Sequence, residues 1–327
     1  MVIGMNQNRF SAVVGQREQI SALNFYLDAQ NKAGIFPFLL FTGAKGVGKT
    51  NLARETTRYL LNSDGTKKPR LEVNCANLKN GKIFAEMYLS YIRDSQGLCL
   101  LLDEIHAMSS EVTAILLTLL TTDDNPIREF KYEGSTYSWD IRKINVVACS
   151  SENDKIFPPL IDRMTKIDLG PYSEKELGDI LVQHIGGQAG FGDDLILDIV
   201  STMKGNARAC VKRALEIKTF LAQSNTPTLF STTDWQSLRQ KLGIKEMGMT
   251  NSELSVLRVL DKHGPSTLQM LHASTGLSRS CIRAEVENEL LRHGFLKIEG
   301  LRKITQAGRE LLERIDGKKP QVLPATI

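Results

Sequence analysis

The segment that most constrains the fold is residues 43–50, GAKGVGKT, which fits the pattern G-x-x-x-x-G-K-[ST]. An apolar run at 38–42 precedes it and a helical pattern at 51–61 follows it. In that context the backbone N–H groups of a glycine-rich loop converge on phosphates, and the helix N-terminus adds positive potential. We therefore expect a nucleotide site in which Lys49 reaches the β- and γ-phosphates and Thr50 holds Mg²⁺. The expected nucleotide contacts are Gly43, Ala44, Lys45, Gly46, Val47, Gly48, Lys49, Thr50 and Asn51.

Short apolar runs alternate with amphipathic helical patterns from residue 38 to about residue 169, which is typical of a parallel sheet in an α/β domain. We place five strands at 38–42, 71–74, 98–102, 144–150 and 166–169. The strand pattern stops after Pro171. A parallel five-stranded nucleotide-binding domain, followed by helices, is the predicted fold class.

Capping signals divide the rest of the chain, since 327 residues are enough for two or three domains. Ser173 with Glu176 predicts the start of a helical stretch that runs to about Leu242, and Thr250 with Glu253 predicts the start of a third region. We predict a nucleotide-binding domain at 1–172 with a β-hairpin near 127–141, an all-α lid domain at 173–246, a winged-helix domain at 247–316 and a disordered tail at 317–327.

Composition excludes some classes of protein but does not choose a function. Hydrophobic residues make up 42% and charged residues 24%, the balance of a soluble globular chain. Because no apolar run approaches the roughly 20 residues needed to cross a bilayer, we expect a cytoplasmic protein. The net charge of +4 permits nucleic acid as a partner without arguing for it, and the five histidines lack metal-ligand spacing.

Two carboxylates follow the third predicted strand, at the sheet edge where α/β proteins bind ligands. Asp103 would hold Mg²⁺, and Glu104 would act as general base toward the attacking water, so the pair indicates hydrolysis. Alternatively, Asp103 only caps a following helix. At the end of the fourth strand, Ser150 is our candidate for contact with the γ-phosphate or the water, although a buried serine often bonds only nearby backbone.

The third region has a helix-turn-helix pattern, with a helix at 268–273, a turn at 274–277 and a second helix from Ser278. Basic residues lie in the first turns of that helix and around Gly300, between two short apolar runs. We predict phosphate contacts to DNA without base-specific readout. The predicted DNA-binding residues are Arg279, Arg283, Lys297, Arg302 and Lys303. The alternatives are solvated surface charge, or a winged helix that binds only protein.

Beyond these motifs the chain resembles the RuvB family of AAA+ ATPases, in the right order and over nearly its whole length. Val14 and Gly15 are similar to that family's entry motif beside the adenine pocket, and DEIH at 103–106 is similar to its second motif. PLIDR at 159–163 resembles the family's PLRDR, and GNAR at 205–208 resembles its GTPR. The resemblance implies an arginine finger at Arg163 and a sensor arginine at Arg208. Ile161 replaces the segment's first arginine, and Ala44 and Lys45 replace two prolines usual in the loop.

The resemblance also implies partners. A neighbouring subunit supplies the finger in this family, so we expect a hexameric ring around duplex DNA. A hairpin between the third and fourth strands docks the RuvA partner in the family, and the aromatic residues predicted for that contact are Phe130, Tyr132, Tyr137 and Trp139. The alternatives are a surface ion pair for Arg163 and packing of the hairpin against its own ATPase core.

The leading hypothesis from the sequence is therefore an ATP- and Mg²⁺-dependent motor that translocates duplex DNA and drives branch migration of Holliday junctions. The runner-up is an ATP-controlled assembly switch on DNA, such as a clamp-loader-like subunit or a regulator of transposition or replication initiation. The ATP motifs are common to both classes. The order of nucleotide domain, lid and winged helix favours the motor.

Overall fold

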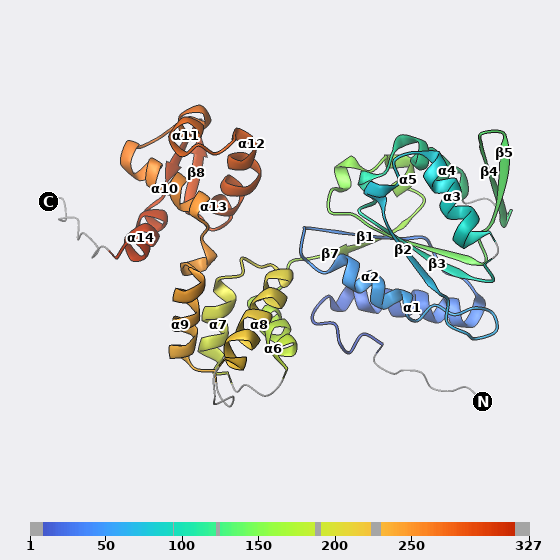
Figure 1. Ribbon diagram of the computed structural model, residues 1–327, viewed down its shortest axis with the longest axis horizontal. Helices are drawn as coiled ribbons and strands as arrows, with labels where there is room; N and C mark the ends of the chain where they lie inside the picture. Colours follow the sequence, from blue (N-terminus) through green and yellow to red (C-terminus); the bar gives the residue numbers. More distant parts are fainter. Residues whose placement is uncertain (1–8, 94, 122–124, 187–190, 224–229, 318–327) are drawn as a thin grey trace. The chain divides into compact units, whose positions relative to one another are not determined.

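A computed structural model describes residues 9–93, 95–121, 125–186, 191–223 and 230–317 (Figure 1). The chain forms two compact units, the first from residues 1–186 and 205–216 and the second from residues 187–204 and 217–327. The division into three domains proposed above stays a prediction. Most of the predicted disordered tail, residues 318–327, lies outside the described residues.

The first unit is built around a parallel five-stranded sheet with the strand order β2-β3-β6-β1-β7. The strands are β1 (Leu39–Gly43), β2 (Arg70–Asn74), β3 (Leu98–Asp103), β6 (Ile144–Cys149) and β7 (Thr165–Leu169). All five confirm the predicted strands, and each end agrees to within one residue. In this order β1 lies between β6 and β7, and the loop that leaves β1 therefore lies near the carboxyl ends of its neighbours.

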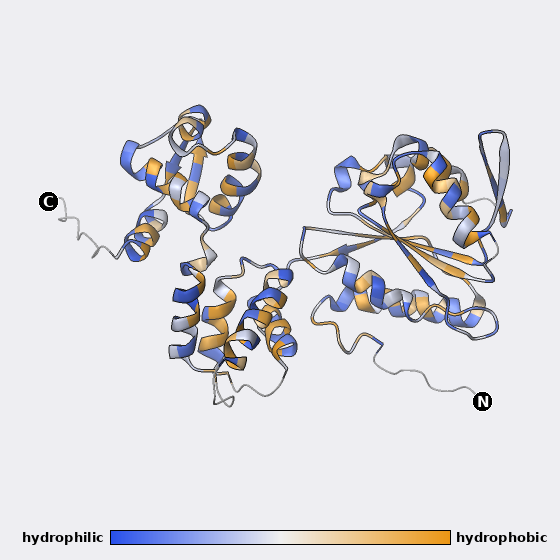
Figure 2. Ribbon diagram, viewed as in Figure 1, coloured by the Kyte–Doolittle hydropathy of each residue, from blue (hydrophilic) through white to orange (hydrophobic). Residues whose placement is uncertain are grey.

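Helices cover both faces of the sheet because its central strands are apolar on both sides. Successive side chains of a strand point to opposite faces. Leu100 and Leu102 of β3 pack in one core with α3 (Gly81–Met87), α4 (Ser110–Leu119) and α5 (Pro158–Ile161), whereas Leu101 packs in the other core with α1 (Arg17–Ala33) and α2 (Lys49–Thr57). Figure 2 shows these inward surfaces as the apolar ones.

The remaining elements of the first unit are short segments and the start of a helical region. They are η1 (Cys75–Asn77), η2 (Tyr88–Ile92), η3 (Ile105–Ala107), β4 (Ile127–Tyr132), β5 (Ser135–Asp140), η4 (Asn153–Lys155), α6 (Glu174–Ile185) and the first part of α8 (Ala207–Ala222). The antiparallel pair β4 and β5 confirms the predicted hairpin. Ser173 and Glu176 form the predicted capping box of α6.

The second unit contains helices and a small antiparallel sheet. Its elements are α7 (Asp193–Ser201), α9 (Thr232–Leu242), η5 (Glu246–Gly248), α10 (Asn251–His263), α11 (Leu268–Thr275), α12 (Arg279–Cys281), η6 (Ile282–Glu287), α13 (Asn288–Arg292), β8 (Leu296–Glu299), β9 (Leu301–Ile304) and α14 (Gln306–Ile315). Thr250 and Glu253 form the capping box predicted for α10. The helix-turn-helix and the two wing strands confirm the predicted winged helix. None of the helices in the described residues is long and apolar enough to cross a membrane.

Candidate functional site

The glycine-rich loop joins β1 directly to α2, as its sequence predicts. Gly43 has φ 137°, and a Cβ there would lie 2.6 Å from the carbonyl oxygen of Leu169 on the neighbouring strand. Gly48, the residue before α2, has the left-handed φ of 90°. Only glycine adopts both conformations without strain. The loop therefore turns sharply at the sheet edge, between the end of β1 and the N-terminus of α2.

Lys49 is buried at the first position of α2, with 7% of the residue exposed. Its Nζ donates to the carbonyl oxygens of Gly43 and Ala44, at 2.9 and 2.8 Å. Burial lowers the pKa of Lys49, and the carboxylate of Glu104 acts in the opposite direction. The ammonium group is thus held against the loop, close to the carboxylates that end β3.

Thr50 and Asp103 bring two oxygen ligands together from separate elements. The hydroxyl of Thr50 donates to Oδ1 of Asp103 at 2.9 Å. Mg²⁺ prefers hydroxyl and carboxylate oxygens, and usually takes only one or two protein ligands beside phosphate oxygens and water. The donor pair therefore fits a magnesium ion bound together with a nucleotide.

A cavity of 410 Å³ opens beside the loop, entirely within the first unit. Its size suits a drug-sized or nucleotide-sized ligand. Nine predicted site residues line it, namely Val14, Lys45, Gly46, Gly48, Lys49, Thr50, Asn51, Glu104 and Arg208. The other predicted nucleotide contacts, Gly15, Gly43, Ala44 and Val47, flank the lining residues in sequence. The structure thus brings together segments that lie as far apart in sequence as residues 14 and 208.

Nine further residues that the sequence did not predict as site residues line this cavity, and Arg54, Tyr172 and His184 are among those with polar side chains. Arg54 lies four residues after Thr50 on α2, so helical periodicity alone places the two on one face. Tyr172 is partly buried, and burial raises the pKa of its hydroxyl. Tyr172 and His184 carry no sequence pattern that separates them from ordinary surface residues.

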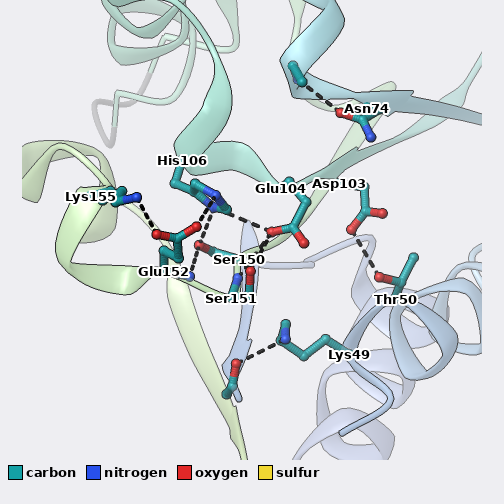
Figure 3. A network of polar contacts seen from close by, with 12 residues as sticks. Lys49, Thr50, Asn74, Asp103, Glu104, His106, Ser150, Ser151, Glu152 and Lys155 are labelled. Carbon is teal, nitrogen blue, oxygen red and sulfur yellow. Dashed lines mark hydrogen bonds and ion pairs between the residues drawn. The ribbon is translucent and has the colours of Figure 1, made fainter. Parts of the chain in front are cut away.

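Glu104 stands at the junction of β3 and η3 with the left-handed φ of 53°, which is uncommon outside glycine and concentrates at functional sites. Its Oε2 accepts hydrogen bonds from the backbone N–H and the hydroxyl of Ser151, at 3.2 and 2.9 Å (Figure 3). Ser151 was not predicted. The consecutive serines that follow β6 were the available signal, because only one of two neighbouring side chains faces a given side.

Ser150 has a different set of contacts from the one its predicted role requires. It is fully buried, and its Oγ lies 2.9 Å from Nδ1 of His106 and accepts from the backbone N–H of Glu152 at 3.1 Å. The structure therefore places the hydroxyl of Ser151, not that of Ser150, on the general-base candidate. The contact of Ser150 with phosphate or water stays a prediction.

Arg163 does not line the cavity of its own chain. It is half-buried between α5 and β7, where its Nη1 donates to the carbonyl oxygen of Pro159 at 2.6 Å. Among the described residues no carboxylate pairs with it. Its guanidinium keeps further donors for another group, and its action on a neighbouring subunit stays a prediction.

The aromatic face of the hairpin is turned inward, which corrects the expectation for two of its four rings. Phe130 is 4% exposed and Trp139 is 0% exposed. Tyr88 of η2 lies against both rings, and Phe130 stacks on Tyr137 at 4.8 Å between centroids. Period-two alternation put these rings on one face, and the apolar surface of α3 and η2 covers that face. Phe130 and Trp139 therefore contact their own domain, and a partner-contact role does not fit them. Tyr132 remains partly exposed.

Arg279 and Arg283 are exposed on the second helix of the helix-turn-helix. No carboxylate pairs with either of them among residues 230–317. The helix continues through a π-helical turn, η6, and such turns often mark functional sites. These two guanidinium groups are therefore free to meet phosphate, and their contact with DNA stays a prediction.

The wing residues differ from this pair because carboxylates neutralise them. Arg302 donates from Nε and Nη2 to Glu287, at 2.8 and 3.3 Å, and the two side chains are only 13% and 7% exposed. The geometry corrects the prediction that Arg302 binds DNA, since its planar group is occupied by a buried partner. Lys297 and Lys303 both pair with the exposed Glu299, at 3.4 and 2.9 Å.

Two segments of the chain match known protein families. Residues 39–172 match the ATPase family associated with various cellular activities (AAA), and residues 246–313 match the RuvB C-terminal winged helix domain. The Holliday junction branch migration complex subunits RuvB of Mycoplasma genitalium and Mycoplasma pneumoniae are 24% and 26% identical over 318 residues, which cover 93% of this chain and 96% of each relative.

A solved structure has the same fold over nearly the whole chain. The RuvB Holliday junction branch migration motor of Thermotoga maritima matches with a TM-score of 0.71 and 21% identity, covering 92% of this chain and 95% of that chain. The AAA domain makes this chain a nucleotide-binding ATPase. The chain thus combines an AAA domain with a RuvB C-terminal winged helix domain in one polypeptide, and it is similar to RuvB proteins over nearly its whole length.

Proposed function

We propose that this protein is a DNA motor that uses ATP hydrolysis to move duplex DNA and drive branch migration of Holliday junctions. The observation that carries the proposal is the combination, in one chain, of an ATPase site with an adjacent carboxylate pair and a RuvB winged helix. This winged helix exposes Arg279 and Arg283, which pair with no carboxylate in the part of the chain that the structure describes. The relatives named as branch migration subunits support it, because they align over 93% of the chain.

Within the cavity, we assign each residue by what its side chain can do. Lys49 and the backbone N–H groups of residues 43–50 hold the phosphates. Thr50 and Asp103 would hold Mg²⁺, which supplies neutralisation of phosphate charge when bound. Glu104 accepts the proton of the attacking water, and Ser151 fixes its carboxylate by holding Oε2.

Arginines complete the site from two sides. Arg208 lies at the start of α8 in the cavity of its own chain, where it can pair with phosphate oxygens. Arg163 lies outside that cavity, and we assign it to the ATP of a neighbouring subunit. This assignment requires a ring, for which we propose a hexamer, and it makes assembly part of catalysis.

The DNA surface that we propose contains fewer residues than the sequence indicated. Arg279 and Arg283 contact backbone phosphates, and base-specific contacts are not needed because a motor must accept any sequence. Lys297 and Lys303 contribute only when DNA phosphate displaces Glu299 from them. For a RuvA-type junction-binding partner, we propose the outward face of the hairpin, which includes Ile127 and Lys131.

Strand exchange on synthetic four-way junctions tests the function. The protein, with ATP, Mg²⁺ and a RuvA-type junction-binding protein, should convert labelled junctions to duplex products, and a non-hydrolysable ATP analogue should not support this conversion. The control is the same reaction with the Glu104→Gln variant. DNA-stimulated ATPase activity without strand exchange on any junction would instead favour the assembly switch.

A further inference from the structure

His106 lies between two carboxylates on different segments (Figure 3). Its Nδ1 is 3.4 Å from Oε2 of Glu104 and 2.9 Å from the hydroxyl of Ser150. Its Nε2 is 3.3 Å from Oε1 of Glu152. The imidazole is only 11% exposed, so few other orientations are open to it. One ring therefore connects the general-base candidate of η3 to the segment that follows β6.

Glu152 is in turn fixed from the other side. Lys155 forms an ion pair with its carboxylate, and this contact lowers the pKa of Glu152, so that Glu152 stays ionised at neutral pH. The backbone N–H of Glu152 donates to Ser150, which also contacts the imidazole. Both ring nitrogens thus contact groups that are themselves held by other residues, Glu152 by Lys155 and Ser150 by the backbone of Glu152.

His106 and Glu152 lie outside the nucleotide cavity. His106 and Lys155 line a separate cavity of 420 Å³ between α4 and the segment of η4 and α5. Neither His106 nor Glu152 lines the cavity that contains Lys49 and Glu104. The pair therefore faces the nucleotide cavity only through the residues that it contacts, and of these Glu104 lines that cavity.

The contacts of Glu104 indicate what the pair does. Its Oε2 is shared by Ser151 and His106, whereas Oε1 has no partner among the described residues and remains able to accept from water. A general base works only when its carboxylate stays within hydrogen-bond reach of the proton that it takes. In its imidazolium form His106 has an N–H on both ring nitrogens, so it can face Glu104 and Glu152 together. Contact of Oε2 with Ser151 and with this imidazolium restricts the rotation that would move the other oxygen away.

We propose that His106 is a positioning residue for Glu104 and that Glu152 keeps the imidazole in place, so that a polar pair outside the nucleotide cavity sets the rate of hydrolysis. The inference rests on the proposed role of Glu104 as general base. Ser151 and His106 both contact Oε2 of Glu104, and Glu152 keeps His106 in place.

Substitution of the exposed partner tests the proposal with little risk to folding, because the side chain of Glu152 is 44% exposed. Glu152→Ala should lower kcat about tenfold, as expected when one charge-assisted hydrogen bond no longer orients a reacting group, and should leave the Kd for ATP unchanged. Glu152→Gln keeps an oxygen acceptor for Nε2 and should recover most of the rate. Asp154→Asn removes the same charge two residues away and should match the unsubstituted protein.

A double-mutant cycle separates positioning from a general structural effect. His106→Asn should lower kcat about tenfold in the unsubstituted protein but less than twofold in a Glu104→Gln background, because its effect requires the base. An equal loss in both backgrounds, a weakened Kd for ATP or a lowered midpoint of thermal unfolding would overturn the proposal. Normal hydrolysis by Glu104→Gln alone would contradict the base assignment in the proposed function, and the cycle thereby distinguishes the two failures.

Discussion

The hydroxyl of Thr50 donates to Oδ1 of Asp103 across 2.9 Å and thereby joins the first turn of α2 to the end of β3. These elements are far apart in the sequence, and the parallel sheet brings them together because β1 and β3 end at the same edge. The pair gives the phosphate loop and the carboxylates a fixed relation to each other.

Asp103→Asn should raise the Mg²⁺ concentration needed for half-maximal ATPase activity by about tenfold or more, because one charged oxygen ligand is lost. The nucleotide affinity measured in excess chelator should change little, since the phosphate loop is intact. A titration of ATPase activity against Mg²⁺ checks this. Asp179→Asn, an exposed carboxylate of α6 outside the cavity lining, is the matched control. An unchanged Mg²⁺ dependence would remove Asp103 from the metal site.

Lys49 and Glu104 should fail in different ways. Lys49→Ala should abolish ATP binding or turnover, whereas Glu104→Gln should bind ATP and hydrolyse it about 10² to 10⁴ times more slowly, because only the second change spares the phosphate cradle. Equilibrium binding of a fluorescent ATP analogue, measured beside steady-state ATPase activity, resolves the two defects. Full activity in the Glu104 variant would show that another group activates the water.

Substitution of both Arg279 and Arg283 by alanine should weaken duplex binding and lower the slope of log K against log salt by about 1.8, since two phosphate contacts each release counterions. Binding measured at several salt concentrations checks this. Arg302→Ala should behave differently, because it leaves Glu287 buried without a partner. We expect it to reduce the free energy of unfolding by about 3 kcal/mol. An unaltered salt slope in the double variant would place the DNA surface elsewhere.

Glu299 should compete with DNA for the wing lysines. Hydrogen bonds from Lys303 and Lys297 hold the pKa of Glu299 below its ordinary 4.5, so its carboxylate stays ionised at neutral pH and the pairing weakens only as the pH falls through the lowered value. The competition by Glu299 should therefore be constant between pH 6 and 8, and the titration of Glu299 should add no pH dependence to DNA affinity in that range. Glu299→Gln mimics the acidic form at neutral pH and should strengthen duplex binding and steepen its salt dependence. Weaker binding by this variant would mean that the lysines do not face DNA.

The sequence predicted most closely those features in which local pattern and global fold agree. The five sheet strands, the hairpin, both capping boxes and the winged helix were all placed by apolar periodicity and side-chain capping signals. Such signals act over a few residues, and burial of the same residues in the fold reinforces them. The phosphate loop belongs to this class, since its glycines are required by the backbone itself.

Choices between neighbouring or chemically similar side chains could not be made from the sequence. Ser150 and Ser151 are identical in sequence terms, and their side chains point to different sides of the strand end. Ser151 contacts Glu104, which lines the nucleotide cavity. The charge of Arg302 was visible, but its pairing with Glu287 depends on how the wing packs against η6. Likewise, an aromatic face is apolar whether it meets a partner or its own core, and only the fold placed Trp139 inside.

The role of Arg163 requires that it act on the ATP of a neighbouring subunit, which agrees with its position outside the cavity of its own chain. Arg163→Ala should therefore bind ATP but hydrolyse it slowly, by a factor of about 10³ to 10⁵. A Lys49→Ala subunit has the opposite defect, since it cannot use ATP but still presents an intact Arg163. Mixing the two inactive variants should create some interfaces with a working loop and a working finger, and ATPase activity should partly return. If mixed rings demonstrably form and no activity returns, or if Arg163→Ala alone hydrolyses ATP normally on DNA, Arg163 does not act across the subunit interface.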